Sequence, residues 1–192
     1  MTSNRLSRPH DARAQRSRKA LQQALLQLVE QKPLDQITIR EITTQAGVSY
    51  PTFFRQFTNR DELLADIAKE EIHRLISFTW PLFDSTCHRT SLQALCDYID
   101  NHRALWTALL TTGAASAMRS EFIRIALDIS QSGKRMNPWL PADLSAPFVT
   151  GAILEILTWW LRQPAAYPID NVITLLDVLV VSPAVRPFDF QT

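Results

Sequence analysis

The sequence predicts an all-α protein, with an N-terminal three-helix domain followed by a larger helical bundle. Along most of the 192-residue chain, apolar residues recur at the three- and four-residue spacing of a helix face. Capping residues, glycine and proline fall between these stretches, where helices begin and end. Residues 81–192 show no strict alternation of apolar and polar residues, the pattern typical of a half-buried strand.

The first predicted helix follows a proline-containing arm that carries Arg5 and Arg8. Arg13, Arg16 and Lys19 lie in its first half. Its inner face is an apolar stripe formed by Leu21, Ala24, Leu25, Leu28 and Val29. Arg16 and Lys19 project from the opposite side. A run of basic residues is most often a solvated face, and only the two helices that follow favour a binding role for this one.

The second predicted helix begins with a capping box, in which Thr38 covers one unpaired helix N–H group and Glu41 covers another. Ile39, Ile42 and Ala46 then share one face. Gly47 stands where helices commonly end in a left-handed residue. The sequence therefore predicts a short helix that ends in a glycine turn.

The third predicted helix has Ser49 as its N-cap and tolerates Pro51 in its first turn. Phe53 and Phe57, four residues apart, form its inner face. The side chains that point outward form a mixed hydrogen-bonding surface: Tyr50, Thr52, Arg55 and Gln56. Two helices joined by a short glycine turn predict a helix-turn-helix, whose second helix lies in the major groove of DNA. The alternative is an αα-hairpin that only packs a core.

The charge of the chain is divided unevenly. Residues 1–60 hold 10 Lys and Arg against 4 Asp and Glu, a net charge of +6, whereas residues 61–192 hold 10 against 15, a net charge of −5. A basic domain is the electrostatic signature of nucleic-acid binding. The charge and the helix-turn-helix therefore indicate the same function for the same part of the chain.

The fourth predicted helix has Asn59 as its N-cap, with Asp61 and Glu62 in its first turn. One apolar stripe follows, formed by Leu64, Ile67, Ala68, Ile72 and Leu75. We expect the helix to end at Trp80, because a proline disfavours helical geometry in the residue before it.

Further helical stripes follow, separated by glycine and proline. They are Leu92, Leu95 and Ile99; Leu105, Trp106, Leu109 and Leu110; and Met118, Phe122, Ile125, Ala126 and Ile129. The segment from Ala146 to Leu161 differs, because Glu155 is its only charged residue. At sixteen residues it is short for a membrane span of about 20, so we expect a helix buried in a core or a subunit interface. A last apolar helix is predicted over residues 168–181.

Other functional classes find little support. Four glycines, no nucleophile elbow and no paired carboxylates indicate that the chain is not an enzyme and has no cofactor. Cys87 and Cys96 lie near His88 and His102, but the spacing matches no zinc pattern. The polar N-terminus has no signal-peptide pattern, so we expect a cytoplasmic protein with reduced thiols and no membrane association.

The first 70 or so residues resemble the N-terminal domain of the tetracycline-repressor (TetR/AcrR) family of bacterial transcriptional regulators. Four segments carry the resemblance: residues 37–42 (ITIREI), 46–49 (AGVS), 52–57 (TFFRQF) and 59–64 (NRDELL). The resemblance implies a DNA-binding domain at residues 1–58. It also implies a ligand-binding and dimerisation domain at residues 59–192.

The resemblance also implies roles for single residues. Thr38 and Arg40 would lie near the DNA backbone, and Arg60 would hold a phosphate. The remaining DNA-binding candidates lie on the third helix, which would enter the groove, and on the first: Ser49, Tyr50, Pro51, Thr52, Phe54, Arg55, Gln56, Arg16 and Lys19. Two residues depart from the family pattern. Phe54 replaces a frequent tyrosine that bonds a phosphate, and Pro51 replaces a small residue and offers an apolar ring to a thymine methyl group.

Candidate residues in the second domain follow from its apolar and aromatic content. A ligand pocket would draw on Trp80, Phe83, Trp106, Phe122, Phe148, Glu155 and Trp159. By resemblance, the last two long helices would form the dimer interface, with Ile153, Leu157, Trp160, Val172, Leu175, Leu176 and Leu179 as candidates. Glu155 needs a partner, either a ligand or an arginine across the dimer, and we favour the arginine.

These features predict a homodimeric repressor that binds a palindromic operator on double-stranded DNA and leaves it when a small-molecule effector binds. Two alternatives remain. One is a ligand-dependent activator of the same family, and the other is a helical protein-interaction dimer that does not bind DNA.

Overall fold

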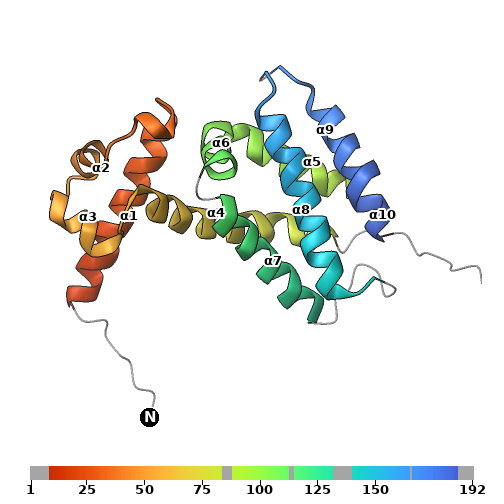
Figure 1. The fold of residues 1–192 in the computed structure, drawn as a ribbon, viewed down its shortest axis with the longest axis horizontal. Helices are drawn as coiled ribbons and strands as arrows, with labels where there is room; N and C mark the ends of the chain where they lie inside the picture. Colours follow the sequence, from red (N-terminus) through yellow and green to blue (C-terminus); the bar gives the residue numbers. More distant parts are fainter. Residues whose placement is uncertain (1–8, 84–87, 113–114, 132–139, 165, 186–192) are drawn as a thin grey trace, which may run out of the picture. The chain divides into compact units, whose positions relative to one another are not determined.

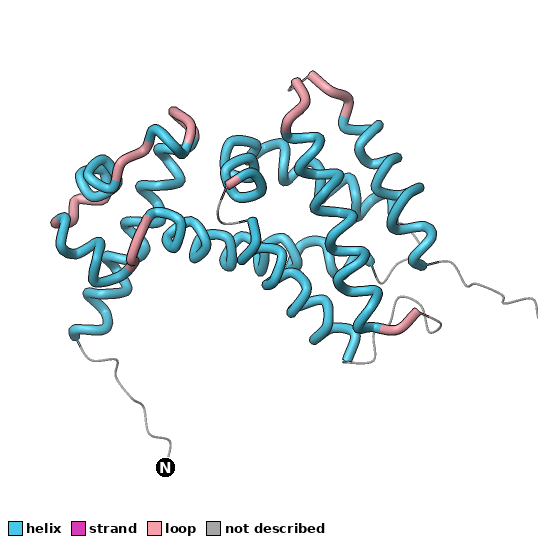
Figure 2. Tube along the Cα trace, in the orientation of Figure 1, coloured by secondary structure: helices cyan, strands magenta, loops and turns pink. Residues whose placement is uncertain are grey.

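The computed structural model describes residues 9–83, 88–112, 115–131, 140–164 and 166–185, and in these residues every regular element is a helix (Figures 1 and 2). The predicted all-α fold is confirmed. The chain forms two compact units, residues 1–67 and residues 68–192. The boundary between them falls inside one helix, α4.

The first unit contains α1 (Pro9–Val29), the 3-10 turn η1 (Leu34–Gln36), α2 (Ile39–Gln45), α3 (Tyr50–Gln56) and the start of α4 (Arg60–Phe83). Helix α1 contacts both α2 and α3, and α2 contacts α3 (Figure 1). The predicted inner faces of α1, α3 and the start of α4 are buried, while in α2 Ile42 is buried and Ile39 and Ala46 are half-buried. The core of this unit includes Leu21, Ala24, Leu25, Leu28, Val29, Ile42, Phe53, Phe57, Leu64 and Ile67.

The start and end signals of α2 act as predicted. The backbone N–H of Glu41 donates to Thr38 Oγ1 at 3.2 Å, and the backbone N–H of Thr38 donates to Glu41 Oε2 at 2.8 Å. This is a complete capping box. Gly47 follows with φ of +64°, the left-handed conformation that glycine adopts without strain. Local sequence signals thus determine both ends of this helix.

Helix α3 has Ser49 at its N-cap position, but the Ser49 hydroxyl does not bond a backbone N–H there. The hydroxyl instead lies 2.7 Å from the hydroxyl of Thr52, one turn further along. Pro51 occupies the first turn, as expected. The predicted start is therefore correct, while the predicted role of the serine side chain is wrong.

Helix α4 starts with the predicted cap, since the backbone N–H of Glu62 donates to Asn59 Oδ1 at 2.8 Å. Its predicted end at Trp80 is wrong. The helix continues through Pro81 to Phe83. A proline removes one backbone hydrogen bond but does not force a helix to stop, so its position predicted the helix end only approximately.

The second unit contains α5 (His88–Asn101), α6 (Arg103–Thr111), α7 (Ala115–Gln131), α8 (Ala142–Leu161), α9 (Ile169–Leu176), the π-helical segment η2 (Asp177–Val181) and α10 (Ser182–Val185). Helix α8 contacts α6, α7 and α9, while α5 contacts α9 (Figure 1). The single helix predicted over residues 168–181 is therefore an α-helix that continues as a π-helical turn.

Arg103 joins two of these helices. Its Nη2 donates to the carbonyl oxygens of Trp160 at 2.9 Å and Gln163 at 3.1 Å, near the C-terminus of α8. Its guanidinium also lies 5.1 Å from the centre of the Trp160 ring. Arg103 thereby adds a donor to the Trp160 carbonyl, which also accepts the backbone N–H of Gln163 at 2.9 Å, and it holds the buried indole in place.

Helix α8 is longer than predicted, since it starts four residues earlier, and it is not buried on every side. Leu157 and Trp160 are buried, but Phe148 is 62% exposed. Gly151 leaves room for the guanidinium of Arg119 on α7, because a Cβ atom at this position would lie 2.7 Å from Arg119 Nη2. One face of α8 therefore belongs to the core of the unit, and another lies open on the single chain.

Candidate nucleic-acid interface

Helix α3 separates its side chains into a buried and an exposed set. Phe53 and Phe57 are buried, which fixes the helix on the core of residues 1–67. The opposite side carries the predicted groove-facing residues. Of these, Ser49, Tyr50, Pro51, Phe54 and Arg55 are exposed, and Thr52 and Gln56 are half-buried. The structure thus gathers all seven on one short helix and its cap.

Two aromatic rings dominate this surface. The centres of the Tyr50 and Phe54 rings are 5.2 Å apart, and their planes meet at 62°. Phe54 also lies edge-to-face on the buried Phe53, at 5.3 Å and 73°. Both arrangements are favourable for aromatic pairs. The two exposed rings are therefore anchored on the core.

Exposed basic side chains lie on α1, α2 and α3. In the part of the chain that the structure describes, no hydrogen bond or ion pair engages the guanidinium of Arg40 or Arg55 or the ammonium of Lys19, and all three are exposed. Arg16 is also exposed and donates from Nε to the carbonyl oxygen of Ala12 in its own helix, at 3.2 Å. These groups are free to neutralise an anionic partner.

Glu41, the acidic residue that follows Arg40 at the start of α2, is paired with a lysine. Lys32 Nζ lies 2.6 Å from Glu41 Oε1. The hydrogen bond from Lys32, together with those from the backbone and hydroxyl of Thr38, lowers the pKa of Glu41 to about 2. The carboxylate at the start of α2 is thus held by protein donors, which limits its repulsion of phosphate.

Arg60 is engaged with the protein itself. Its Nη1 donates to the carbonyl oxygens of Leu34 and Ile37, each at 2.6 Å, while its Nε is buried with no hydrogen-bond partner among the described residues. The side chain therefore holds the segment between η1 and α2. This role was not predicted, because no pattern along the chain relates Arg60 to carbonyl groups more than twenty residues away.

Arg18 is a second residue whose role the sequence did not reveal. Its Nε donates to Asp66 Oδ2 at 2.8 Å, its Nη2 bonds Asp66 Oδ1, and its guanidinium lies 5.1 Å from the centre of the Phe57 ring. Gln22 Nε2 donates to the same carboxylate at 3.1 Å. These contacts fasten α1 to α4 and to the end of α3. The candidate interface is therefore built on a rigid support.

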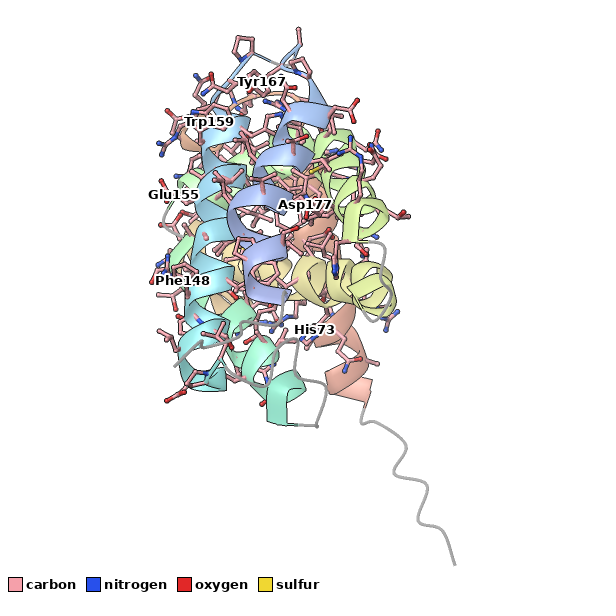
Figure 3. All side chains as sticks on the ribbon, turned by 90° about the vertical axis from the view of Figure 1, so that its right-hand side faces the viewer. His73, Phe148, Glu155, Trp159, Tyr167 and Asp177 are labelled. Carbon is pink, nitrogen blue, oxygen red and sulfur yellow. The ribbon has the colours of Figure 1, made fainter. Side chains whose placement is uncertain are left out.

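The predicted ligand-binding residues do not form one group. Trp106 is fully buried in the core, Phe122 is half-buried, and Phe148, Glu155 and Trp159 are exposed on α8. Figure 3 shows these last three along the length of α8. Trp80 and Phe83 lie in α4, but their side chains fall outside the described residues.

The predicted dimerisation residues are also divided. Leu157, Trp160, Val172 and Leu176 are buried inside the single chain, and Ile153 and Leu175 are half-buried. Leu179 is 60% exposed, as is its neighbour Val178 on η2. The open apolar surface of this unit, as far as it is described, consists of Leu144, Phe148, Trp159, Val178 and Leu179.

Four buried polar atoms of the second unit have no hydrogen-bond partner among the described residues. They are Nδ1 of His88, the hydroxyl of Ser91 and the indole nitrogens of Trp106 and Trp160. Cys96 is also buried, and this burial raises the pKa of its thiol to about 12, while Cys87 lies outside the described residues. Buried donors without partners are rare in folded proteins.

By length and composition alone, residues 143–161 could cross a membrane, since this segment of α8 has a mean hydropathy of 1.4. Only 28% of it is buried within the chain. Core and interface helices of soluble proteins have the same composition. One face of α8 is therefore apolar and exposed on the single chain.

Comparisons with known proteins agree with this geometry. Residues 22–67 match the family model of bacterial regulatory proteins of the tetR family. No curated protein matches the chain in sequence. Among solved structures, the chain is similar to Thermus thermophilus FadR, a TetR-family transcriptional repressor in complex with lauroyl-CoA. The two are 13% identical with a TM-score of 0.65, covering 91% of this chain and 98% of that one.

Two further structures are similar in fold. RolR in complex with resorcinol is 16% identical, with a TM-score of 0.61, and the match covers 95% of this chain and 100% of that one. The dihydroxyacetone kinase operon activator DhaS is 18% identical, with a TM-score of 0.56, and the match covers 88% and 96% of the two chains. At these identities the likeness shows the shared fold, which extends over both units.

Proposed function

Because this chain belongs to the tetR family of bacterial regulatory proteins and is a DNA-binding transcriptional regulator, we propose that it acts as a homodimeric repressor. Residues 1–58 bind one half of a palindromic operator. Residues 59–192 form the dimer and bind a small molecule that releases the DNA. Such release requires that the ligand bind the DNA-free conformation more tightly than the DNA-bound one.

The observation that carries this proposal is the exposed face of α3. Its apolar residues Phe53 and Phe57 are buried, while Arg55 and the aromatic and hydroxyl side chains beside it are available to a partner. A helix presented in this way, next to basic residues without protein partners, suits the major groove of duplex DNA. The phosphate contacts would come from Arg16, Lys19 and Arg40.

The open apolar face of α8 supports the proposed homodimer. Leu144, Phe148, Glu155 and Trp159 recur at helical spacing on one side of α8, the C-cap residue Arg162 continues this spacing, and all five are exposed. A second copy placed by a two-fold axis would cover the same face on both chains. We propose that Glu155 then pairs with Arg162 of the second copy, which would supply the partner that this carboxylate lacks among the described residues.

A charge exchange tests this interface. Glu155→Arg should shift the protein from dimer to monomer in sedimentation experiments, and adding Arg162→Glu should restore the dimer. Phe148→Ala should weaken the dimer without affecting the charge pair. A wild-type protein that is monomeric, or that partitions into lipid vesicles, would contradict the proposed interface.

The buried donors in the second unit support a ligand with an apolar body and an acceptor oxygen. The indole groups of Trp106 and Trp160 would donate to such an oxygen. FadR and RolR bind lauroyl-CoA and resorcinol respectively, so acyl and phenolic compounds are the first to test. An effector must raise the Tm of the protein and lower its affinity for the operator.

The experiment that tests DNA binding is selection from a random duplex pool, followed by a salt titration on the selected sequence. We expect an inverted repeat, with half-sites spaced by about one helical turn or a multiple of it. Its affinity should fall about a thousandfold or more between 50 and 200 mM salt. No enrichment, with or without candidate effectors, would favour a helical protein-interaction dimer.

Other modes within the family are distinguished by transcription assays. DhaS is an activator with a similar fold, so the fold alone does not distinguish a repressor from an activator. We propose a repressor located in the cytoplasm, with no enzymatic activity of its own. A reporter placed behind the selected operator should be silenced by the protein, and activation would instead assign the DhaS-like mode.

A further inference from the structure

The aromatic pair on α3 is only partly covered by the fold. Among the described residues of the first unit, Tyr50 and Phe54 are the large apolar side chains left exposed, at 49% and 48%. The other large apolar residues of α3, Phe53 and Phe57, are buried. Two neighbouring aromatic rings open to water on a small domain mark a contact surface.

This pair is held in place before any partner arrives. Phe54 lies edge-to-face on the fully buried Phe53, and Tyr50 lies edge-to-face on Phe54. A ring fixed in this way loses little conformational freedom when it binds. Pro51, with its fixed backbone and exposed apolar ring, lies between the two aromatic residues in the sequence. The surface is therefore a rigid apolar patch formed by Tyr50, Pro51 and Phe54.

The charged residues on α3 and α2 indicate what kind of partner binds the apolar patch. Arg55 on the same helix and Arg40 on α2 are exposed and have no protein partner among the described residues. An apolar patch accompanied by free cations is complementary to a polyanion that carries apolar groups. In the major groove of duplex DNA, the apolar group at the base edge is the C5-methyl of thymine.

We infer that Tyr50 and Phe54 are specificity-determining residues that contact thymine methyl groups in each half of the operator. The inference rests on the proposed function and adds to it a chemical preference for thymine. Phe54 has no hydroxyl with which to bond a phosphate, so its exposed ring contributes through apolar contact. Tyr50 adds its ring to the same contact, and its hydroxyl is not required.

The test replaces thymine by deoxyuridine, which removes the methyl group and leaves the hydrogen-bonding edge unchanged. Each thymine of the selected operator is replaced in turn, and the Kd of the full-length protein is measured. We expect at least one position per half-site where the substitution weakens binding about fourfold, the factor that corresponds to about 0.8 kcal/mol for one buried methyl-sized group. Deoxyuridine at the other positions should have no effect.

Protein variants connect this effect to the aromatic pair. Phe54→Ala and Tyr50→Ala should reduce affinity for the thymine operator and abolish the difference between thymine and deoxyuridine at the sensitive positions. Tyr50→Phe is the matched control, because it keeps the ring and should keep the full difference. Thermal unfolding of each variant shows whether the domain is folded before its binding is interpreted.

The outcomes separate this inference from the proposed function. An enriched operator that is insensitive to deoxyuridine, or that has no thymine in its half-sites, would overturn the thymine contact and leave the DNA-binding proposal intact. Failure to enrich any sequence would overturn both. If Phe54→Ala reduced self-association and left the thymine preference unchanged, the patch would be a protein contact instead.

Discussion

The hydroxyl of Tyr98 on α5 donates a hydrogen bond to the carboxylate of Glu71 on α4, which is only 3% exposed. Arg74 Nη1 lies 2.6 Å from the other oxygen of the same carboxylate. The ring of Tyr98 packs on His102, with their centres 4.6 Å apart. A buried charge is thus satisfied from two sides, and it fastens α4 to α5 within the second unit.

Tyr98→Phe should destabilise the second unit. The change removes one donor from a buried carboxylate, which costs about 1–3 kcal/mol when the remaining group stays desolvated. Urea unfolding monitored by tryptophan fluorescence measures this loss. Tyr167→Phe, whose half-buried ring packs on Trp159, is the control and should change stability by less than about 0.5 kcal/mol. Equal losses of unfolding free energy in the two variants would show that the hydroxyl of Tyr98 has no special role.

Alkaline pH should weaken the same contact. Burial and the hydrogen bond to Glu71 raise the pKa of Tyr98 above its ordinary value of 10. A group whose pKa is raised on folding stabilises the protein below the unfolded pKa, and the stabilisation is lost as pH rises through the folded pKa. The stability advantage of the wild type over Tyr98→Phe should therefore be constant up to about pH 9 and decrease at higher pH. A constant difference up to pH 11 would contradict this expectation.

Acid should weaken the first turn of α2. The hydrogen bond from Lys32, followed by those from Thr38, lowers the pKa of Glu41 to about 2. A lowered pKa stabilises the folded state above the unfolded value of 4.5, and this stabilisation is lost as pH falls toward 2. NMR titration should locate the pKa of Glu41 well below 4, and Lys32→Ala should raise it. The same pKa in both proteins would show that Lys32 is not the cause.

Arg55→Ala should relax sequence preference. If Arg55 reads a base edge, its loss costs about 1–3 kcal/mol at one operator position and little on random DNA. Lys19→Ala is the comparison, because loss of a phosphate contact should weaken binding to all sequences and reduce the salt slope by about 1. Competition assays on operator and random duplexes separate the two effects. Equal losses on both duplexes for Arg55→Ala would assign that residue to the DNA backbone.

Arg60→Ala should destabilise the first unit in the absence of DNA. Its guanidinium satisfies the carbonyl oxygens of Leu34 and Ile37, and the loss of such bonds costs about 1–3 kcal/mol. If Arg60 served only a phosphate, thermal unfolding without DNA would not change. Measuring Tm first and DNA affinity second therefore distinguishes a positioning residue from a phosphate ligand.

The helix-turn-helix could be predicted from the sequence because its signals are local. Thr38 and Glu41 are three residues apart, Gly47 ends the same helix, and Asn59 caps the helix that begins at the next residue. Each signal acts within one helical turn and needs no tertiary contact. The buried faces of α1 and α3 follow from the same short-range spacing.

The contacts that support the interface could not be predicted in this way. Arg18 and Asp66 are 48 positions apart, and Arg60 bonds carbonyl groups of a preceding segment. Such pairs depend on how helices pack against one another in three dimensions. The spacing of apolar residues along the sequence does not predict that packing. The sequence predicted that α8 is buried in a core or a subunit interface, but it did not say which side is open on the single chain. An apolar composition does not distinguish a side packed within the chain from an exposed side.

The residue types that position 47 can accept are limited by backbone conformation and not by the space around the side chain. A Cβ atom built there would meet no other atom within 4 Å, yet φ is +64°. Asparagine visits this conformation at modest cost, whereas a β-branched residue does not. Position 47 therefore selects a residue by its backbone conformation alone, and a side chain of any volume that tolerates a positive φ would preserve the turn between α2 and α3.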